Sequence, residues 1–344
     1  MTLHSEIHEQ PGQLAGLLEQ RAQVEQIAAA IQRQAPCFVF LAARGTSDNA
    51  GRYANYLWGA ANRLPLALAT PSLFTLYGQP PALKHALVVA VSQSGKSPDI
   101  IRVIQEGRSQ GCLTLAITNA PASPLAQASD LVLDVQAGEE RSVAATKSYT
   151  AQLLAIAMLS AALAGSEAAW QELAGLPTWA AQMLTQDETI ARMAQRYRYM
   201  NQCVVLGRGY NYATAYEWAL KLKELTYLIA DPYSSADFQH GPIAMVEGGF
   251  PVLAVAPQGK VFSSMLEMIA ALRNEHAAEL VVVSDDDQAL NLAQSPICLP
   301  AGIPEWLTPI IAIIAGQLFA YHLTMVKGYD PERPRGLRKE TETQ

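Results

Sequence analysis

The sequence predicts an α/β protein made of two tandem, doubly wound parallel-sheet domains that are related by internal duplication. Two dipeptides indicate the duplication, because Arg44-Gly45 recurs as Arg208-Gly209 and Gly95-Lys96 recurs as Gly259-Lys260. The differences 208 − 44 and 259 − 95 are both 164. A constant offset of this size indicates two domain-sized copies rather than a solenoid of short repeats.

Short apolar runs alternate with helical patterns in the first half. Strands are expected at Cys37–Ala42, Leu66–Ala69, Ala86–Val91, Leu113–Thr118 and Leu131–Val135, and helices at about Asp48–Ala61 and at Pro98–Gln110. Continuous apolar strands separated by helices are typical of a parallel sheet covered on both faces. Ligands of such sheets bind at the carboxyl ends of the strands.

The second half repeats this order of elements. Strands are expected at Cys203–Leu206, Val252–Ala256, Leu280–Ser284 and Ile297–Leu299. Two apolar helices, Tyr149–Ala164 and Leu307–Val326, fall at matching places in the two copies. Equivalent buried core helices explain both better than a membrane span explains one of them.

The elements divide the chain into five parts. We expect an N-terminal segment of one or two helices at most (1–34), a first domain (35–165), a helical connector (166–195), a second domain (196–328) and a tail (329–344). Prolines in the tail, Pro331 and Pro334, predict an extended conformation. The N-terminal segment is too short for a helix-turn-helix DNA-binding domain.

Composition narrows the class of protein. Half of the residues are hydrophobic, 16% are charged and the net charge is −7, which indicates a compact globular protein. The chain has no basic run, so we expect neither nucleic-acid binding nor a membrane partner. The four cysteines occur singly, without metal-ligand spacing, and are expected to be reduced in a cytoplasmic protein; no cofactor and no metal is expected.

Two hydroxyl-rich loops follow predicted strands of the first half. Gly45-Thr46-Ser47-Asp48 follows one strand, and Ser92-Gln93-Ser94-Gly95-Lys96-Ser97 leads from another strand to Pro98. Free N–H groups at a helix start, together with serine hydroxyls, predict a phosphate site, and Ser97 can cap the helix. The alternative is a capped loop without a ligand. Neither common nucleotide-binding glycine motif is present.

One helix of the second half carries charges on a single face. Glu217, Lys221 and Glu224 lie at i, i+4 and i+7. A solvated surface is the ordinary interpretation of such a pattern. A histidine, His240, follows in a turn-rich loop. A histidine, a carboxylate and a lysine near one sugar phosphate would supply acid/base groups and an amine.

These motifs resemble the sugar-isomerase (SIS) family over about residues 35–341. The resemblance includes the isomerase half of glucosamine-6-phosphate synthase and the related stand-alone glucosamine-6-phosphate deaminases. It rests on Gly45-Thr46-Ser47, Ser92-Gln93-Ser94-Gly95, Ala144-Ala145-Thr146-Lys147, the segment Glu217–Glu224, His240-Gly241-Pro242 and the tail Pro334–Lys339. It implies two SIS-type, flavodoxin-like domains and a phosphorylated amino sugar as ligand.

The resemblance also implies residue roles. The phosphate would be held by Thr46, Ser47, Ser92, Gln93, Ser94 and Ser97. Val143 would lie beside the sugar, and Ala145 stands where the synthase has a sugar-contacting serine. Lys96 and Ser97 likewise replace an acidic residue and a threonine, which favours the deaminase branch.

The implied catalytic groups lie in the second half and the tail. Glu224 would move a proton between C1 and C2, with Glu217 and Lys221 as charged neighbours. His240 would open the sugar ring, reaching over from the partner in a homodimer. Lys339, in the tail over the active site, would form a Schiff base with the open-chain ketose.

Three functions remain open at this point. The glutaminase domain of the synthase is not in this sequence, so we expect hydrolysis instead: glucosamine 6-phosphate and water give fructose 6-phosphate and ammonia. The first alternative is an isomerase or deglycase of another N-substituted sugar phosphate. The second is a non-catalytic sugar-phosphate sensor.

Overall fold

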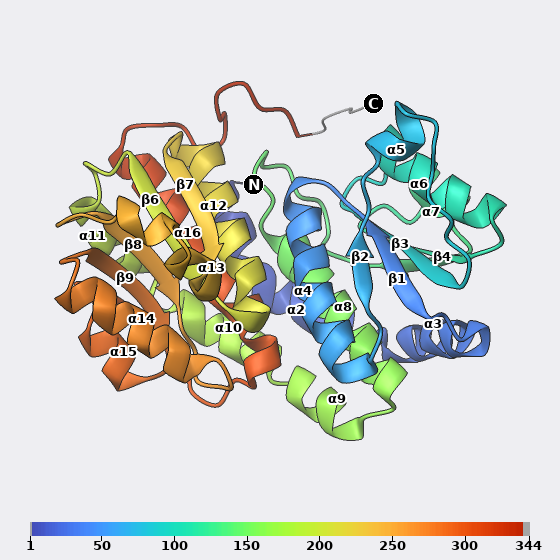
Figure 1. Cartoon of the computed structure of the whole chain (residues 1–344), viewed down its shortest axis with the longest axis horizontal. Helices are drawn as coiled ribbons and strands as arrows, with labels where there is room; N and C mark the ends of the chain where they lie inside the picture. Colours follow the sequence, from blue (N-terminus) through green and yellow to red (C-terminus); the bar gives the residue numbers. More distant parts are fainter. Residues whose placement is uncertain (1, 340–344) are drawn as a thin grey trace. The chain divides into compact units, whose positions relative to one another are not determined.

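The computed structural model describes residues 2–339, which form two compact units (Figure 1). The first-half unit contains residues 12–140, 147–174 and 338–339. The second-half unit contains residues 2–11, 141–146 and 175–337. The N-terminal helix and the short segment 141–146 therefore belong with the second half of the chain.

The first-half unit is built on a five-stranded parallel sheet with the order β2-β1-β3-β4-β5. Its strands are β1 (Phe38–Ala42), β2 (Leu66–Leu68), β3 (Ala86–Ser92), β4 (Leu113–Thr118) and β5 (Leu131–Asp134). Its helices are α3 (Arg21–Gln34), α4 (Gly45–Asn62), α5 (Ser72–Thr75), α6 (Pro98–Ser109), α7 (Pro124–Ala128), α8 (Lys147–Ala164) and α9 (Glu167–Leu173). Every residue of β3 is buried, as expected for a central strand covered on both faces.

The second-half unit has the same topology, with the strand order β10-β9-β8-β6-β7. Its strands are β6 (Gln202–Gly207), β7 (Ile229–Ser234), β8 (Pro251–Val255), β9 (Glu279–Ser284) and β10 (Ser295–Cys298). Its helices include α1 (Leu3–His8), α10 (Leu176–Leu184), α11 (Asp187–Arg196), α12 (Tyr212–Thr226), α13 (Ser235–Gln239), α14 (Phe262–Asn274), α15 (Asp287–Asn291) and α16 (Thr308–Val326). Short 3-10 turns occur at Gly209–Asn211, Pro242–Met245 and Glu305–Leu307. The predicted duplicated α/β fold is confirmed.

Strand β7 was missed by the sequence analysis. Asp231 and Pro232 interrupt its apolar pattern. Proline is tolerated because β7 lies at the edge of the sheet, where one row of backbone groups needs no partner strand. The repeat contained the signal, since β2 begins at Leu66 and β7 begins at Ile229, close to the 164-residue offset.

The N-terminal segment contains three helices, so the expectation of one or two at most was wrong. Helix α1 ends at His8, and α2 (Gln10–Leu18) begins almost at once, with Pro11 in its first turn, where proline suits a helix. A short turn at Glu19 and Gln20 then separates α2 from α3. The predicted connector is helical throughout α9, α10 and α11.

The two apolar helices α8 and α16 are core helices. Helix α8 packs on α4, and α16 packs on α12, α11 and α10. The stretch Glu305–Val326 is long and apolar enough to cross a membrane, but 78% of its most apolar window is buried inside the fold. Gly316 of α16 allows close contact with α12, because a Cβ there would lie 2.9 Å from Cγ of Trp218.

Replacing Gly316 with alanine is therefore expected to destabilise the protein. Overpacking of this kind costs about 1–3 kcal/mol, so the urea midpoint of the full chain should fall. Gly59→Ala in α4 is the control, because a Cβ at Gly59 meets nothing within 4 Å and alanine favours a helix over glycine. A Gly316→Ala chain as stable as Gly59→Ala would contradict the close contact.

Candidate active site

The two hydroxyl-rich loops lie at the switch point of the first-half sheet. Strands β1 and β3 are neighbours, whereas the next strands in the chain, β2 and β4, lie on opposite sides of this pair. Ligands of doubly wound sheets bind in the crevice at such a point. Thr46 and Ser47 lie in the first turn of α4, which begins at Gly45, three residues earlier than expected. The Ser47 amide donates to the carbonyl of Arg44, the residue that precedes the helix (3.1 Å).

The second loop is shaped by hydroxyl groups and by one glycine. Ser92 Oγ accepts a hydrogen bond from the Gly95 amide (3.1 Å), and Ser94 Oγ accepts one from the Lys96 amide (3.4 Å). Gly95 has φ +63°, and a Cβ there would lie 2.0 Å from Ser123 Oγ, so only glycine fits. The Gln93 carbonyl accepts the Asn119 amide (3.2 Å).

Ser97 does not cap helix α6, contrary to the sequence prediction. It occupies the N-cap position in an extended conformation, but its side chain makes no capping hydrogen bond. Asp99 of the first turn is instead fully buried and pairs with Arg44 (2.7 Å), the residue that precedes α4. This pair joins the starts of the two helices that border the loops.

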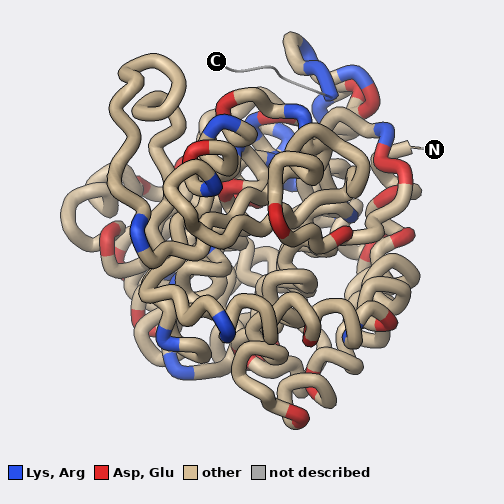
Figure 2. Tube along the Cα trace, turned by 90° about the vertical axis from the view of Figure 1, so that its right-hand side faces the viewer, with Lys and Arg blue, Asp and Glu red and all other residues tan. Residues whose placement is uncertain are grey.

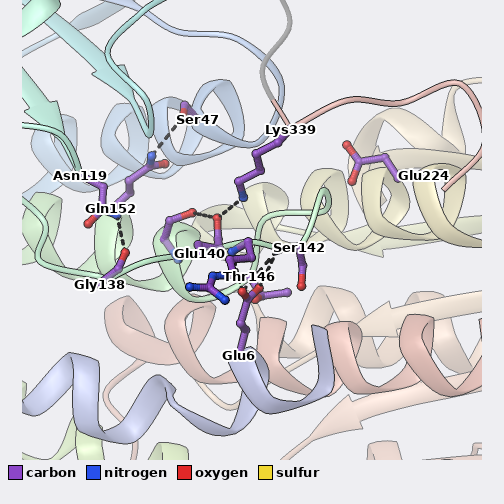
Figure 3. A network of polar contacts seen from close by, with 12 residues as sticks. Glu6, Ser47, Asn119, Gly138, Glu140, Ser142, Thr146, Gln152, Glu224 and Lys339 are labelled. Atoms are coloured by element: carbon purple, nitrogen blue, oxygen red, sulfur yellow. Dashed lines mark hydrogen bonds and ion pairs between the residues drawn. The ribbon is translucent and has the colours of Figure 1, made fainter. Parts of the chain in front are cut away.

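Gln152 of α8 is a polar contact that the sequence analysis missed. Its Nε2 donates to Ser47 Oγ (3.0 Å; Figure 3), and its side chain is almost fully buried. Its Oε1 has no hydrogen-bond partner among the described residues. A glutamine in an otherwise apolar predicted helix was the available signal, because a buried polar group normally needs a partner.

In the equivalent loop of the second copy, residues 256–260, backbone amides donate to carboxylates of the same unit. The Gln258 amide donates to Asp285 Oδ1 (2.7 Å), and the Lys260 amide donates to Glu305 Oε2 (3.0 Å). A Cβ at Gly259 would lie 2.3 Å from the Glu305 carboxyl carbon. The Lys260 amide thus meets a carboxylate, whereas the matching amide of the first copy, that of Lys96, meets the neutral hydroxyl of Ser94.

The charged face of α12 is buried, so the solvated-surface interpretation was wrong. Lys221 Nζ lies 3.3 Å from Glu217 Oε1 and 2.5 Å from Glu224 Oε2. The side chains of Lys221 and Glu217 are 1% and 0% exposed, but that of Glu224 is 22% exposed. Of the three, Glu224 is the group that solvent or a ligand can reach.

The two carboxylates hold Lys221 as a cation. Burial alone would lower the pKa of Lys221, but the charges of Glu217 and Glu224 more than offset this and raise the pKa above its ordinary range. Lys221 is therefore a fixed positive charge beside Glu224 and not a neutral amine at physiological pH.

His240 directly follows α13 and is exposed to solvent. Its ring makes no hydrogen bond within the described part of the chain, and no contact places it against the α12 carboxylates. Val143 and Ala145 lie half-buried in the segment Arg141–Thr146. Glu6 of α1 accepts the amides of Arg141 (2.6 Å) and Ser142 (3.3 Å) and so fixes the start of that segment.

The described chain ends in a tail rich in Lys and Arg (Figure 2). Lys339, at the end of this tail, forms an ion pair within the first-half unit (Figure 3). Its Nζ lies 2.7 Å from Glu140 Oε2, and the Glu140 side chain is fully buried. Glu140 also accepts the amide (3.1 Å) and the hydroxyl (2.8 Å) of Ser148. The sequence analysis did not predict Glu140, because nothing along the chain links it to a residue 199 positions later.

Fold and motifs together define a duplicated, doubly wound α/β protein, and the chain belongs to the SIS domain family. The family model matches residues 33–162 and 197–327, once in each half. The chain is 32% identical to glutamine–fructose-6-phosphate aminotransferase (isomerizing) of Thermus thermophilus over 97% of its own length. It is 33% identical to the enzyme of that name from Gloeobacter violaceus over 97% of its length. The chain spans 57% of each relative's length.

Solved structures agree with this assignment. The C-terminal domain of glucosamine-fructose-6-phosphate aminotransferase from Francisella tularensis is 26% identical, with a TM-score of 0.88 over 96% of this chain and 98% of that domain. A candidate phosphosugar isomerase from Silicibacter pomeroyi DSS-3 is 34% identical, with a TM-score of 0.86 over 96% and 100% of the two chains. Glucosamine-6-phosphate deaminase from Thermotoga maritima shares the fold at 19% identity, with a TM-score of 0.78 over both whole chains.

Removing the positive charge at Lys221 should destabilise the protein strongly. Lys221→Met removes the ammonium group that lies 3.3 Å from the buried Glu217 carboxylate, and breaking a buried ion pair by removing one partner costs about 3–5 kcal/mol. The double variant Glu217→Gln/Lys221→Met should recover part of this loss. Lys223→Met, on the exposed face of the same helix, should change stability by less than about 0.5 kcal/mol.

Urea unfolding of the four chains provides the measurement. Equal stability of Lys221→Met and Lys223→Met would show that the α12 charges are not coupled in the interior. A double variant no more stable than Lys221→Met alone would contradict the pairing with Glu217.

Proposed function

We propose that this chain is an isomerising deaminase of glucosamine 6-phosphate. One observation carries the proposal: Glu224 is a solvent-accessible carboxylate held against a buried Lys221–Glu217 pair. A proton-transfer base needs access to its substrate and a fixed orientation, and this arrangement supplies both. The comparisons suggest the substrate class, since the similar proteins named above include aminotransferases of fructose 6-phosphate and a deaminase of glucosamine 6-phosphate.

The serine loops of the first-half unit would bind the phosphate. Helix-start amides and the hydroxyls of Thr46, Ser92 and Ser94 are donors suited to a dianion. The Ser97 hydroxyl, which makes no capping bond, is available to the same ligand. Gln152 would act indirectly, by fixing the hydroxyl of Ser47. In the second copy, Asp285 and Glu305 accept hydrogen bonds from the equivalent loop, so we expect one phosphate site in each chain.

The proposed reaction has three steps: ring opening, proton transfer and hydrolysis. His240 would open the ring by moving a proton between the C1 hydroxyl and the ring oxygen. Glu224 would take the C2 proton of the open-chain aldose and return it to C1. The amine nitrogen loses one proton and the C1 oxygen gains one, so the C2 amine becomes an imine and the C1 aldehyde becomes an alcohol. Water then adds to C2 and ammonia leaves, giving fructose 6-phosphate. A fixed cation at Lys221 would hold the Glu224 carboxylate in place through their ion pair.

His240 has to come close to the sugar for this role. Its ring is exposed and makes no hydrogen bond in the described chain, as expected for a histidine that acts in the active site of the other subunit of a homodimer. Lys339 would act later, by attacking C2 of the open-chain ketose to form a Schiff base. Its pairing with Glu140 offers a place for the proton that this amine must lose.

A direct test is ammonia release from glucosamine 6-phosphate coupled to detection of fructose 6-phosphate. Glu224→Gln should lower kcat at least about 100-fold, because it removes the acid/base group, and should slow exchange of the C2 hydrogen with solvent. Glu267→Gln, an exposed residue of α14, is the matched control and should leave both rates unchanged.

Each contrary outcome has a distinct meaning. If the folded protein acts only on N-substituted sugar phosphates, such a compound and not glucosamine 6-phosphate is the substrate. A protein that binds sugar phosphates without any turnover would make the chain a sensor. A Glu224→Gln chain that exchanges the C2 hydrogen at the wild-type rate would refute the assigned base.

Borohydride trapping tests Lys339. Reduction in the presence of fructose 6-phosphate should attach one sugar to the wild-type chain at Lys339, as located by peptide mass. Lys339→Arg keeps a cation beside Glu140 but cannot form a Schiff base, so it should give no adduct. Lys84→Arg, at a surface loop, should be labelled like the wild type. An adduct on another lysine, or none, would disprove the role.

A further inference from the structure

Three of the six histidines in the chain meet at a single carboxylate, Asp187. His4 Nε2 lies 2.7 Å and His8 Nε2 lies 3.0 Å from Asp187 Oδ2, and His322 Nε2 lies 2.5 Å from Asp187 Oδ1. The ligand atoms of His4, Asp187 and His322 all lie within 4.8 Å of one another. None of these residues belongs to the proposed active site.

Three helices of the second-half unit bring the cluster together. His4 and His8 are one turn apart on α1, Asp187 is the first residue of α11, and His322 lies near the end of α16. The rings pack closely, with centroids 4.6 Å apart for His4 and His8 and 5.9 Å apart for His4 and His322. Tyr321 stacks on His4 at 4.9 Å and covers one side of the group.

Asp187 brings a negative charge to this cluster. Burial alone would raise its pKa, but hydrogen bonds from His322, His4 and His8 lower it overall, so the carboxylate is ionised at neutral pH. No lysine or arginine forms an ion pair with Asp187 among the described residues. The cluster therefore combines one carboxylate with three imidazole rings.

We propose that His4, Asp187 and His322 form a zinc-binding site, with His8 as a fourth ligand. Imidazole nitrogen and carboxylate oxygen are common zinc ligands, and zinc prefers four of them in a tetrahedron. Bonds of about 2.0–2.1 Å place neighbouring ligand atoms about 3.3 Å apart. The distances from the histidine nitrogens to the Asp187 oxygens are shorter than this, by a few tenths of an ångström to just under about 1 Å. Small side-chain shifts would therefore make room for the ion.

Bound zinc would tie the first helix of the described chain to α11 and α16. Helix α1 has only six residues and owes its place to packing and to Glu6, which holds the amides of Arg141 and Ser142. A metal that fixes α1 therefore also fixes the start of the segment that carries Val143. The site is structural, because its ligands include no proposed catalytic residue.

The test is a zinc titration of the full chain, prepared without an affinity tag, stripped with chelator and held at pH 7.5. Calorimetry should detect one zinc per chain for the wild type. His322→Gln and the double variant His4→Gln/His8→Gln should each bind at least about 10-fold more weakly. His276→Gln, a histidine outside the cluster, should bind like the wild type. Zinc should also raise the Tm of the wild type more than that of the cluster variants.

Cobalt gives an independent readout, because ligation by imidazole and carboxylate produces visible absorption bands that the cluster variants should lack. The proposal is overturned if the wild type binds no zinc, in which case the histidines form only a hydrogen-bonded group around Asp187. It is also overturned if zinc binds equally to the wild type and to His4→Gln/His8→Gln. The latter variant changes only α1, so it keeps the test valid if His322→Gln fails to fold.

Discussion

A topological constraint places the first-half loops. Crossover connections between parallel strands are right-handed. When two strands are neighbours and the next strand in the chain lies to the left of one and to the right of the other, the two connecting helices therefore cover opposite faces of the sheet. Strands β1 and β3 meet this condition, so their carboxyl ends leave a crevice that no connection covers. Gly45, Gly95 and the ion pair between Arg44 and the buried Asp99 are local features that shape this crevice.

Duplication created the same crevice twice, and side-chain chemistry distinguishes the two. In the first copy the loop amides meet neutral serine hydroxyls, which a phosphate can displace or join. In the second copy Asp285 and Glu305 accept amides at the matching place. Since a carboxylate repels a phosphate, the second copy is free to serve another purpose, and its helix α12 buries the charges that surround Glu224.

The five strands of the first half, its helices α4, α6 and α8, and the shared face of Glu217, Lys221 and Glu224 were predictable because they depend on local periodicity. The short helices α5 and α7 were not predicted. Strand β7 was not predicted, because a proline in a short segment argues against a strand. Only the position of β7 at the edge of the sheet, which the sequence does not reveal, makes Pro232 acceptable there. Burial of Lys221 was not predictable, since helical spacing is the same for a surface pair and a buried one. Glu140, Gln152 and the Asp187 cluster depend on contacts between distant residues, and a single sequence carries no record of such contacts.

Helix α1 has a consequence for the order of events during synthesis. Leu3 and Ile7 are fully buried, and α1 packs on α16, about 300 residues further along the chain. A ribosome adds roughly 5–20 residues per second, so α1 waits about 15 to 60 seconds for the surface that it covers. During translation the first-half sheet can therefore form while α1 is still unplaced, and the second-half unit closes only near the end.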